Sequence, residues 1–241
     1  MNSLASRVRC LLAAAACGLL LLPVVVQGRV FRHAAGTAPV VPGTAAYRTT
    51  VEINGGKAEV AVIAPDRPLA DPARWLRSIC ASFGKVLFLR STDEYVVAGA
   101  ASPDRVLRLL SIQLPNQENP LVVEAVQSVR EQALSAVPPA QSMLAGIPTY
   151  PGATVQCHLR NADTRTAVET LSAAAAAEDV LRFYRTSLGE AGWAPVWPES
   201  RHGAPDTLLF SRGHDLCCVM ARPDAPGECT VTVLQKLAAF P

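Results

Sequence analysis

An Asn-Gly pair between two alternating apolar segments constrains the fold of this chain more than any other feature. Residues 47–53 alternate between apolar and polar side chains, which is the period of a strand with one buried face. Asn54 and Gly55 follow at once, and both residue types tolerate the positive φ that a two-residue hairpin turn requires. Residues 58–62 alternate again. The sequence therefore predicts a β-hairpin at the start of the first folded region.

A helix is expected directly after this hairpin. Asp71 can cap free backbone N–H groups and Pro72 fits the first helical turn. An apolar stripe then continues to Gly84, where the helix should end. Cys80 falls on this stripe, so we expect it to be a buried, unreactive thiol.

The rest of the first region is predicted to mix strands and helices. Two short strands are expected at residues 85–90 and 95–98. Ser-Pro at 102–103 and Asn-Pro at 119–120 repeat the pattern of a capping residue before proline. This pattern predicts two more helices, the second of which reaches about residue 135.

The second region repeats the order of hairpin, helix and strands. A proline-containing linker is predicted at residues 136–149, and a hairpin at residues 154–171. The next helix should end at Gly192. Its inward-facing residues are predicted to be Val180, Leu181, Tyr184 and Leu188. Three further strands are expected, near residues 207–210, 216–221 and 229–234.

Together these elements predict the α+β class: two small units, each with a hairpin, a helix and further, mostly antiparallel strands. The first domain is expected at residues 47–135 and the second at 150–238. The repeated order is compatible with an internal duplication. No aligned identities support a duplication, so we favour the interpretation that both units use a common small arrangement.

The N-terminus predicts export. Arg7 and Arg9 precede an apolar run from residue 10 to residue 26, which is the layout of a signal peptide. Cleavage is predicted after Gly28, and an uncleaved anchor in the inner membrane through residues 10–26 is the alternative. Residues 29–46 have no regular period and are interpreted as a flexible tether. We expect a location in the bacterial periplasm or cell envelope.

The charge balance of the exported part disfavours two classes of partner. Without Arg7 and Arg9, the 22 Lys and Arg residues fall to 20, which equals the 20 Asp and Glu residues. A nucleic-acid partner usually requires a basic excess, and so does binding to anionic lipid through a polybasic face. We expect no nucleic-acid partner, and contact with a membrane only through the N-terminal segment if it is retained.

Three short motifs indicate a resemblance. Residues 150–153 read Tyr-Pro-Gly-Ala, residues 182–185 read Arg-Phe-Tyr-Arg, and residues 191–193 read Ala-Gly-Trp, with Leu188 between the last two. This pattern resembles a small module of unknown role that recurs in exported bacterial proteins, and it covers about residues 150–193. The resemblance implies a bacterial envelope setting and supplies no catalytic residues.

Reactive side chains are concentrated in the second region. The sequence lacks a nucleophile elbow, a phosphate-binding loop and a His-Glu-x-x-His motif. The pattern favours a disulfide first, buried free thiols second and a thiolate-imidazole metal site third. A turn near Ala225 would place Cys229 opposite Ala221, which favours Cys157 as the disulfide partner of a later cysteine. The disulfide candidates are Cys157, Cys217, Cys218 and Cys229; the metal candidates are these four with His158 and His214.

The sequence therefore favours a non-enzymatic cell-envelope protein that binds a partner or braces an assembly. The expected partner is another envelope protein, and no cofactor is expected. The alternative is a metal-handling or thiol-dependent protein that uses the Cys/His group of the second region.

Overall fold

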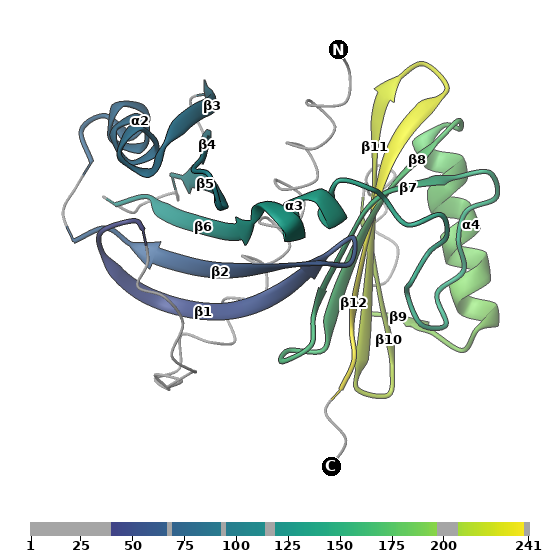
Figure 1. The fold of residues 1–241 in the computed structure, drawn as a ribbon. Helices are drawn as coiled ribbons and strands as arrows, with labels where there is room; N and C mark the ends of the chain where they lie inside the picture. Colours follow the sequence, from purple (N-terminus) through teal and green to yellow (C-terminus); the bar gives the residue numbers. More distant parts are fainter. Residues whose placement is uncertain (1–39, 67–68, 93–94, 114–118, 197–206, 239–241) are drawn as a thin grey trace. The chain divides into compact units, whose positions relative to one another are not determined.

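The structure, a computed structural model, describes residues 40–66, 69–92, 95–113, 119–196 and 207–238. The chain divides into two compact units between Ala136 and Val137 (Figure 1). We call the described residues before this division the N-terminal unit and those after it the C-terminal unit. The predicted signal segment and residues 29–39 of the predicted tether lie outside the described residues.

The N-terminal unit is an antiparallel sheet with one long and one short helix. Its sheet has the strand order β3-β4-β5-β6-β2-β1. The elements are β1 (Thr44–Ile53), β2 (Gly56–Ala64), α2 (Pro72–Phe83), β3 (Lys85–Ser91), β4 (Tyr95–Ala101), β5 (Arg105–Ile112), β6 (Leu121–Ser128) and α3 (Val129–Ser135).

The predicted hairpin and first helix are present. Asn54 and Gly55 have φ angles of 49° and 88°, as the tight turn between β1 and β2 requires. The Asp71 carboxylate accepts a hydrogen bond from the backbone N–H of Arg74 at 2.9 Å and so caps α2. Cys80 is fully buried on the inner face of α2, as expected.

Two predicted helices of this unit are strands instead. Residues 105–112 and 121–128 form β5 and β6, and α3 is the only helix among the described residues of this stretch. The capping patterns before Pro103 and Pro120 were outweighed by strand pairing, because β5 hydrogen-bonds to β4 on one side and to β6 on the other. The predicted tether is also wrong at its end, since β1 begins at Thr44 and Val41 is buried in the core.

The C-terminal unit likewise consists of antiparallel strands with one long helix. Its strand order is β7-β8-β12-β11-β10-β9. The elements are β7 (Thr154–Asn161), β8 (Thr166–Ala173), α4 (Ala177–Glu190), β9 (Ala194–Pro195), β10 (Thr207–Arg212), β11 (Asp215–Ala225) and β12 (Glu228–Lys236).

Helix α4 covers one face of this sheet. Its four buried residues are the ones predicted from the sequence: Val180, Leu181, Tyr184 and Leu188. The region predicted as a linker does not behave as one at its C-terminal end, since Leu144 and Ile147 are buried in the same core. Tyr150 and Phe183 meet edge to face, with ring centroids 5.2 Å apart. The Tyr-Pro-Gly-Ala and Arg-Phe-Tyr-Arg motifs are therefore in contact with each other.

The register of the last hairpin differs from the prediction. Cys229 lies opposite Pro223, and Ala221 lies opposite Val231. The turn is displaced toward Gly227, whose φ of 76° suits the reversal of the chain.

The two units share one sheet topology. Numbered within each unit, the first two strands form a hairpin, the helix follows, and the sheet order is first, second, sixth, fifth, fourth, third. The similarity that the sequence indicated in the order of elements thus extends to their positions in each sheet. Both units combine strands with helices, but strands make up more of the chain than the predicted α+β arrangement, because β5 and β6 stand where helices were expected.

Candidate functional site

The C-terminal unit contains a cluster of polar side chains on β7, on β8 and in the segment before β7. The buried carboxylate of Glu169 lies at its centre. Glu169 on β8 lies opposite His158 on β7, and its side chain is fully buried. The Nδ1 atom of His158 lies 3.0 Å from Oε1 of Glu169, and His158 is only 1% exposed. Glu169 shares a sheet face with Leu171, so the pair lies on the face that α4 covers.

The segment before β7 completes this cluster. The Ser142 hydroxyl donates to Oε2 of Glu169 at 2.6 Å, and the backbone N–H of Met143 donates to Oε1 at 2.5 Å. Two residues on, Ala145 exchanges two hydrogen bonds with the buried side chain of Gln235, at 3.2 and 2.7 Å. Residues 142–147, here called the strap, are therefore fixed across the sheet beside α4.

Ser, His and Glu are the residue types of a nucleophilic triad, but their order here is different. In a triad the base contacts the nucleophile and the acid orients the base. In this cluster the carboxylate lies between the other two, because Ser142 and His158 both contact Glu169. The geometry suits holding the strap in place, since each contact satisfies a buried polar group.

The N-terminal unit has a comparable arrangement. Glu124 on β6 is 4% exposed and accepts hydrogen bonds from the backbone N–H groups of Val40 and Val41, at 3.1 and 2.7 Å. Burial raises the pKa of this carboxyl, while the two backbone hydrogen bonds oppose the rise. In both units a buried glutamate therefore binds the chain just before the first strand.

A second polar network fixes α3. Arg108 on β5 donates to Oε1 of Gln127 at 3.0 Å and also to Oε1 of Gln132. The Gln127 amide donates onward to the Ser135 hydroxyl at 2.7 Å. Gly56 lies beneath the helix so closely that an added Cβ would come within 2.2 Å of the Glu131 carbonyl oxygen. These contacts connect β5, β6 and α3 within the unit.

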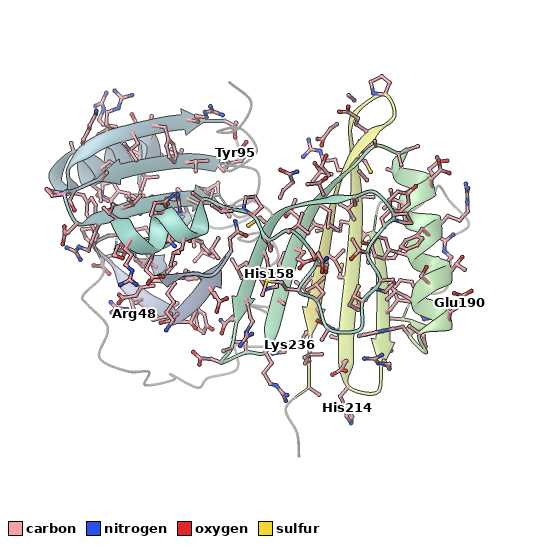
Figure 2. All side chains as sticks on the ribbon, turned by 45° about the vertical axis from the view of Figure 1, so that its right-hand side comes forward. Arg48, Tyr95, His158, Glu190, His214 and Lys236 are labelled. Atoms are coloured by element: carbon pink, nitrogen blue, oxygen red, sulfur yellow. The ribbon has the colours of Figure 1, made fainter. Side chains whose placement is uncertain are left out.

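The structure does not bring the predicted Cys/His group together. Cys217 and Cys229 face the core under α4, whereas Cys157 and Cys218 occupy the opposite face of the sheet. His214 lies exposed in the turn between β10 and β11, away from His158 (Figure 2). Among the described residues, no three His, Cys, Asp or Glu side chains are grouped so that they could hold a metal ion.

The cysteines of the described residues are all free thiols in this structure. It therefore gives no support to the predicted disulfide. Burial raises the pKa of the Cys217 thiol to about 12, and the neighbouring Cys218 adds to the effect. Burial also raises the pKa of Cys218 and of Cys229. These thiols are therefore protonated at neutral pH and are poor nucleophiles.

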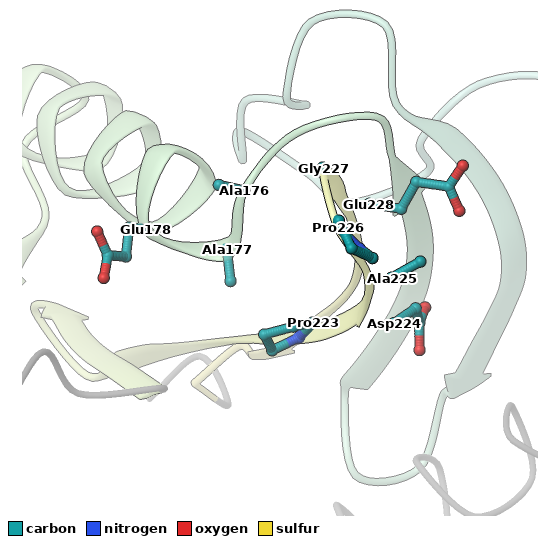
Figure 3. A pocket seen from close by; sticks show the side chains of 9 residues that line it. All are labelled: Ala176, Ala177, Glu178, Pro223, Asp224, Ala225, Pro226, Gly227 and Glu228. Carbon is teal, nitrogen blue, oxygen red and sulfur yellow. The ribbon is translucent and has the colours of Figure 1, made fainter.

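Shallow hollows lie on the described surface of the C-terminal unit. One, of about 490 Å³, lies between the start of α4 and the turn joining β11 to β12, and its carboxylates are Glu178, Asp224 and Glu228 (Figure 3). Another, of about 410 Å³, lies beside Tyr150 and Phe183. Both are open to solvent, and neither contains Glu169 or His158.

Sequence reasoning missed Glu169, Ser142, Gln235 and Glu124. A signal for two of them exists: Glu169 is two residues from Leu171, and Glu124 is two residues from Val122, each pair within one strand. A carboxylate on the buried face of a strand requires a partner, and this requirement marks such positions as structurally important.

Comparison with models of protein families gives no match, and comparison with curated proteins gives none. Among solved structures, the chain is similar to a chain in the crystal structure of the Tle4–Tli4 complex. The identity is 11%, the match covers 79% of this chain and 80% of that one, and the TM-score is 0.24. A TM-score this low does not establish a shared fold.

Proposed function

We propose that this chain is a non-enzymatic cell-envelope protein whose two α+β units bind another envelope protein. The observation that carries the proposal is the set of hydrogen bonds that the Glu169 carboxylate accepts. This carboxylate is fully buried, and both oxygens are occupied by Ser142, Met143 and His158. The carboxylate thus fixes the strap, and its hydrogen bonds are made within the chain instead of to a substrate.

Apolar side chains on the surface support a protein partner. Monomeric proteins usually keep large apolar residues inside, and contiguous exposed ones mark sites of association. Val86 and Leu87 are adjacent on β3 and are 38% and 50% exposed. Met143 on the strap is exposed as well, although its backbone N–H is fixed by Glu169. Rigid backbone beneath exposed apolar side chains lowers the entropy cost of binding.

The cell-envelope part of the proposal rests on the sequence. The basic start, the apolar run of residues 10–26 and the module resemblance of residues 150–193 all favour export. None of the helices among the described residues has both the length and the apolar character that crossing a membrane requires.

The geometry of the described residues supports the alternative, a metal-handling or thiol-dependent protein, less well. That alternative required the Cys/His group to converge, and the two sheet faces separate Cys217 from Cys218.

Native mass spectrometry of the protein isolated from its host's envelope tests this proposal. We expect a complex with a protein partner at a fixed ratio and no added mass from a metal. The matched control is the Glu169→Gln variant, which keeps the shape of the buried side chain and should keep the partner. An isolated chain that carries a stoichiometric metal, lost when the thiols are alkylated, would contradict the proposal and restore the alternative.

A further inference from the structure

Strand β3 is the outermost strand at one end of the N-terminal unit's sheet (Figure 1). It pairs with β4 along one side, from Lys85 opposite Ala101 to Ser91 opposite Val96. No strand of the described residues pairs with its other side. An open edge of this kind presents backbone N–H and C=O groups that can accept a further strand.

Packing against β4 and against the core holds β3 in place. The Phe88 ring lies over Gly99 of β4, where an added Cβ would come within 2.6 Å of the ring. Leu89 packs against the core cluster beneath α2. A strand fixed by such contacts is preformed, so a binding partner does not have to order it.

Strand β3 has exposed apolar side chains with a positively charged side chain on either side of them. Val86 and Leu87 are 38% and 50% exposed, and Lys85 and Arg90 are exposed on either side of them. The strand contains no acidic residue. Proteins usually protect an open edge with charges and bulges, and a bulge is present here between Val86 and Phe88.

The charges argue against pairing with a second copy of the chain. A symmetric antiparallel pairing centred between Leu87 and Phe88 would place Lys85 of each copy opposite Arg90 of the other. Like charges directly opposite each other destabilise a strand pair, whereas opposite charges stabilise it. A segment with carboxylates at both ends and apolar residues between them complements this edge instead.

We propose that the β3 edge binds an extended segment of a protein partner, which adds a strand to the sheet and places acidic side chains against Lys85 and Arg90. This inference rests on the proposed function, because it names the surface through which the partner is bound. Main-chain hydrogen bonds supply the affinity, and the charged ends with Val86 and Leu87 between them supply the selectivity.

Synthetic peptides as long as β3, with 7 residues, test the edge directly. One peptide has glutamate at both ends and alternating valine and threonine between; the other has lysine at both ends and the same interior. In fluorescence anisotropy with the full chain, the acidic peptide should bind at least about fivefold more tightly. N-methylation of its edge-facing amides should abolish binding, since this change removes the donors without altering the protein.

Charge reversal in the protein provides the matching variant. Lys85→Glu combined with Arg90→Glu should reverse the preference between the two peptides. Arg130→Glu, an exposed change on α3 away from the edge, should leave the preference as it is. Equal affinity for both peptides, or no binding of either up to about 1 mM, overturns the proposal.

The same variants separate this inference from the proposed function. If the charge-reversed protein still co-isolates with its envelope partner, the partner uses another surface, so the edge inference is wrong while protein binding stands. If the peptides bind as expected but no partner is found in the envelope, the preference of the edge for acidic extended segments stands, while the proposed function fails. Loss of the partner on charge reversal, and its retention in Arg130→Glu, supports both.

Discussion

Replacing Glu169 by alanine should destabilise the C-terminal unit by about 3–5 kcal/mol. The substitution removes the acceptor for His158, which is buried, and for Ser142 and Met143, which are partly exposed. A buried polar group without a partner costs about 1–3 kcal/mol, and the exposed pair recovers part of its loss from water. The missing side-chain volume adds a cavity. A loss of this size is a large fraction of the stability of a small domain.

Pulsed thiol labelling in urea, followed by mass spectrometry, measures this loss in each unit. Cys217 and Cys229 are buried in the C-terminal unit and become reactive when it unfolds, while Cys80 reports on the N-terminal unit. The unfolding free energy of a small domain falls by about 1–3 kcal/mol per M urea. The urea concentration at which Cys217 and Cys229 are half labelled should therefore fall by roughly 2 M.

Glu169→Gln is the control for shape. Its oxygen can accept from Met143 and His158, and its amide can donate to the Ser142 hydroxyl, so the expected loss is about 1 kcal/mol. If Glu169→Ala changes the unfolding free energy of the C-terminal unit by less than about 1 kcal/mol, the carboxylate does not fix the strap and the reasoning is refuted.

Four further predictions concern other parts of the fold. The pKa of Glu124 is raised in the folded state. At pH values above the ordinary glutamate pKa, ionisation of this carboxyl therefore favours the unfolded state. The unfolding free energy of the N-terminal unit should therefore increase as the pH falls from 7 toward that range, and Glu124→Gln should flatten this dependence in urea titrations. Gly189→Ala should stabilise α4 by up to about 1 kcal/mol in thermal unfolding, because an added Cβ there meets nothing within 4 Å. Gly56→Ala should destabilise its unit, since the Cβ would overlap α3. Without reductant, maleimide should modify Cys218 before Cys217 in the folded protein, and it should label all five cysteines of residues 29–241 after denaturation; fewer would indicate a disulfide.

Local signals in the sequence predicted the hairpins and the long helices. The β1–β2 turn needs positive φ at two positions, and Asn54-Gly55 supplies both. The stripe of α4 specified its buried face, and Asp71 specified the start of α2. In each case, residues close together in the chain determine the structure.

The predictions were wrong where contacts between residues far apart in the sequence determine the structure. Residues 105–112 and 121–128 carry apolar side chains toward both faces, so no clear period distinguishes a central strand from a buried helix. Their strand form follows from pairing with β4 and β2. The strap was mistaken for a linker because its partners, Glu169 and Gln235, are about 26 and 90 residues away. A carboxylate on a buried strand face requires a hydrogen-bonding partner, but the sequence does not show which residue that partner is.

Isolation of the protein from its host's envelope, with native mass spectrometry of the wild type beside the Lys85→Glu/Arg90→Glu variant, tests the central claim most directly. The wild type is expected to form a fixed-ratio complex with an envelope protein and to carry no metal. The variant is expected to lose that partner. A wild-type chain that is isolated without any protein partner but with a tightly held metal would contradict the account.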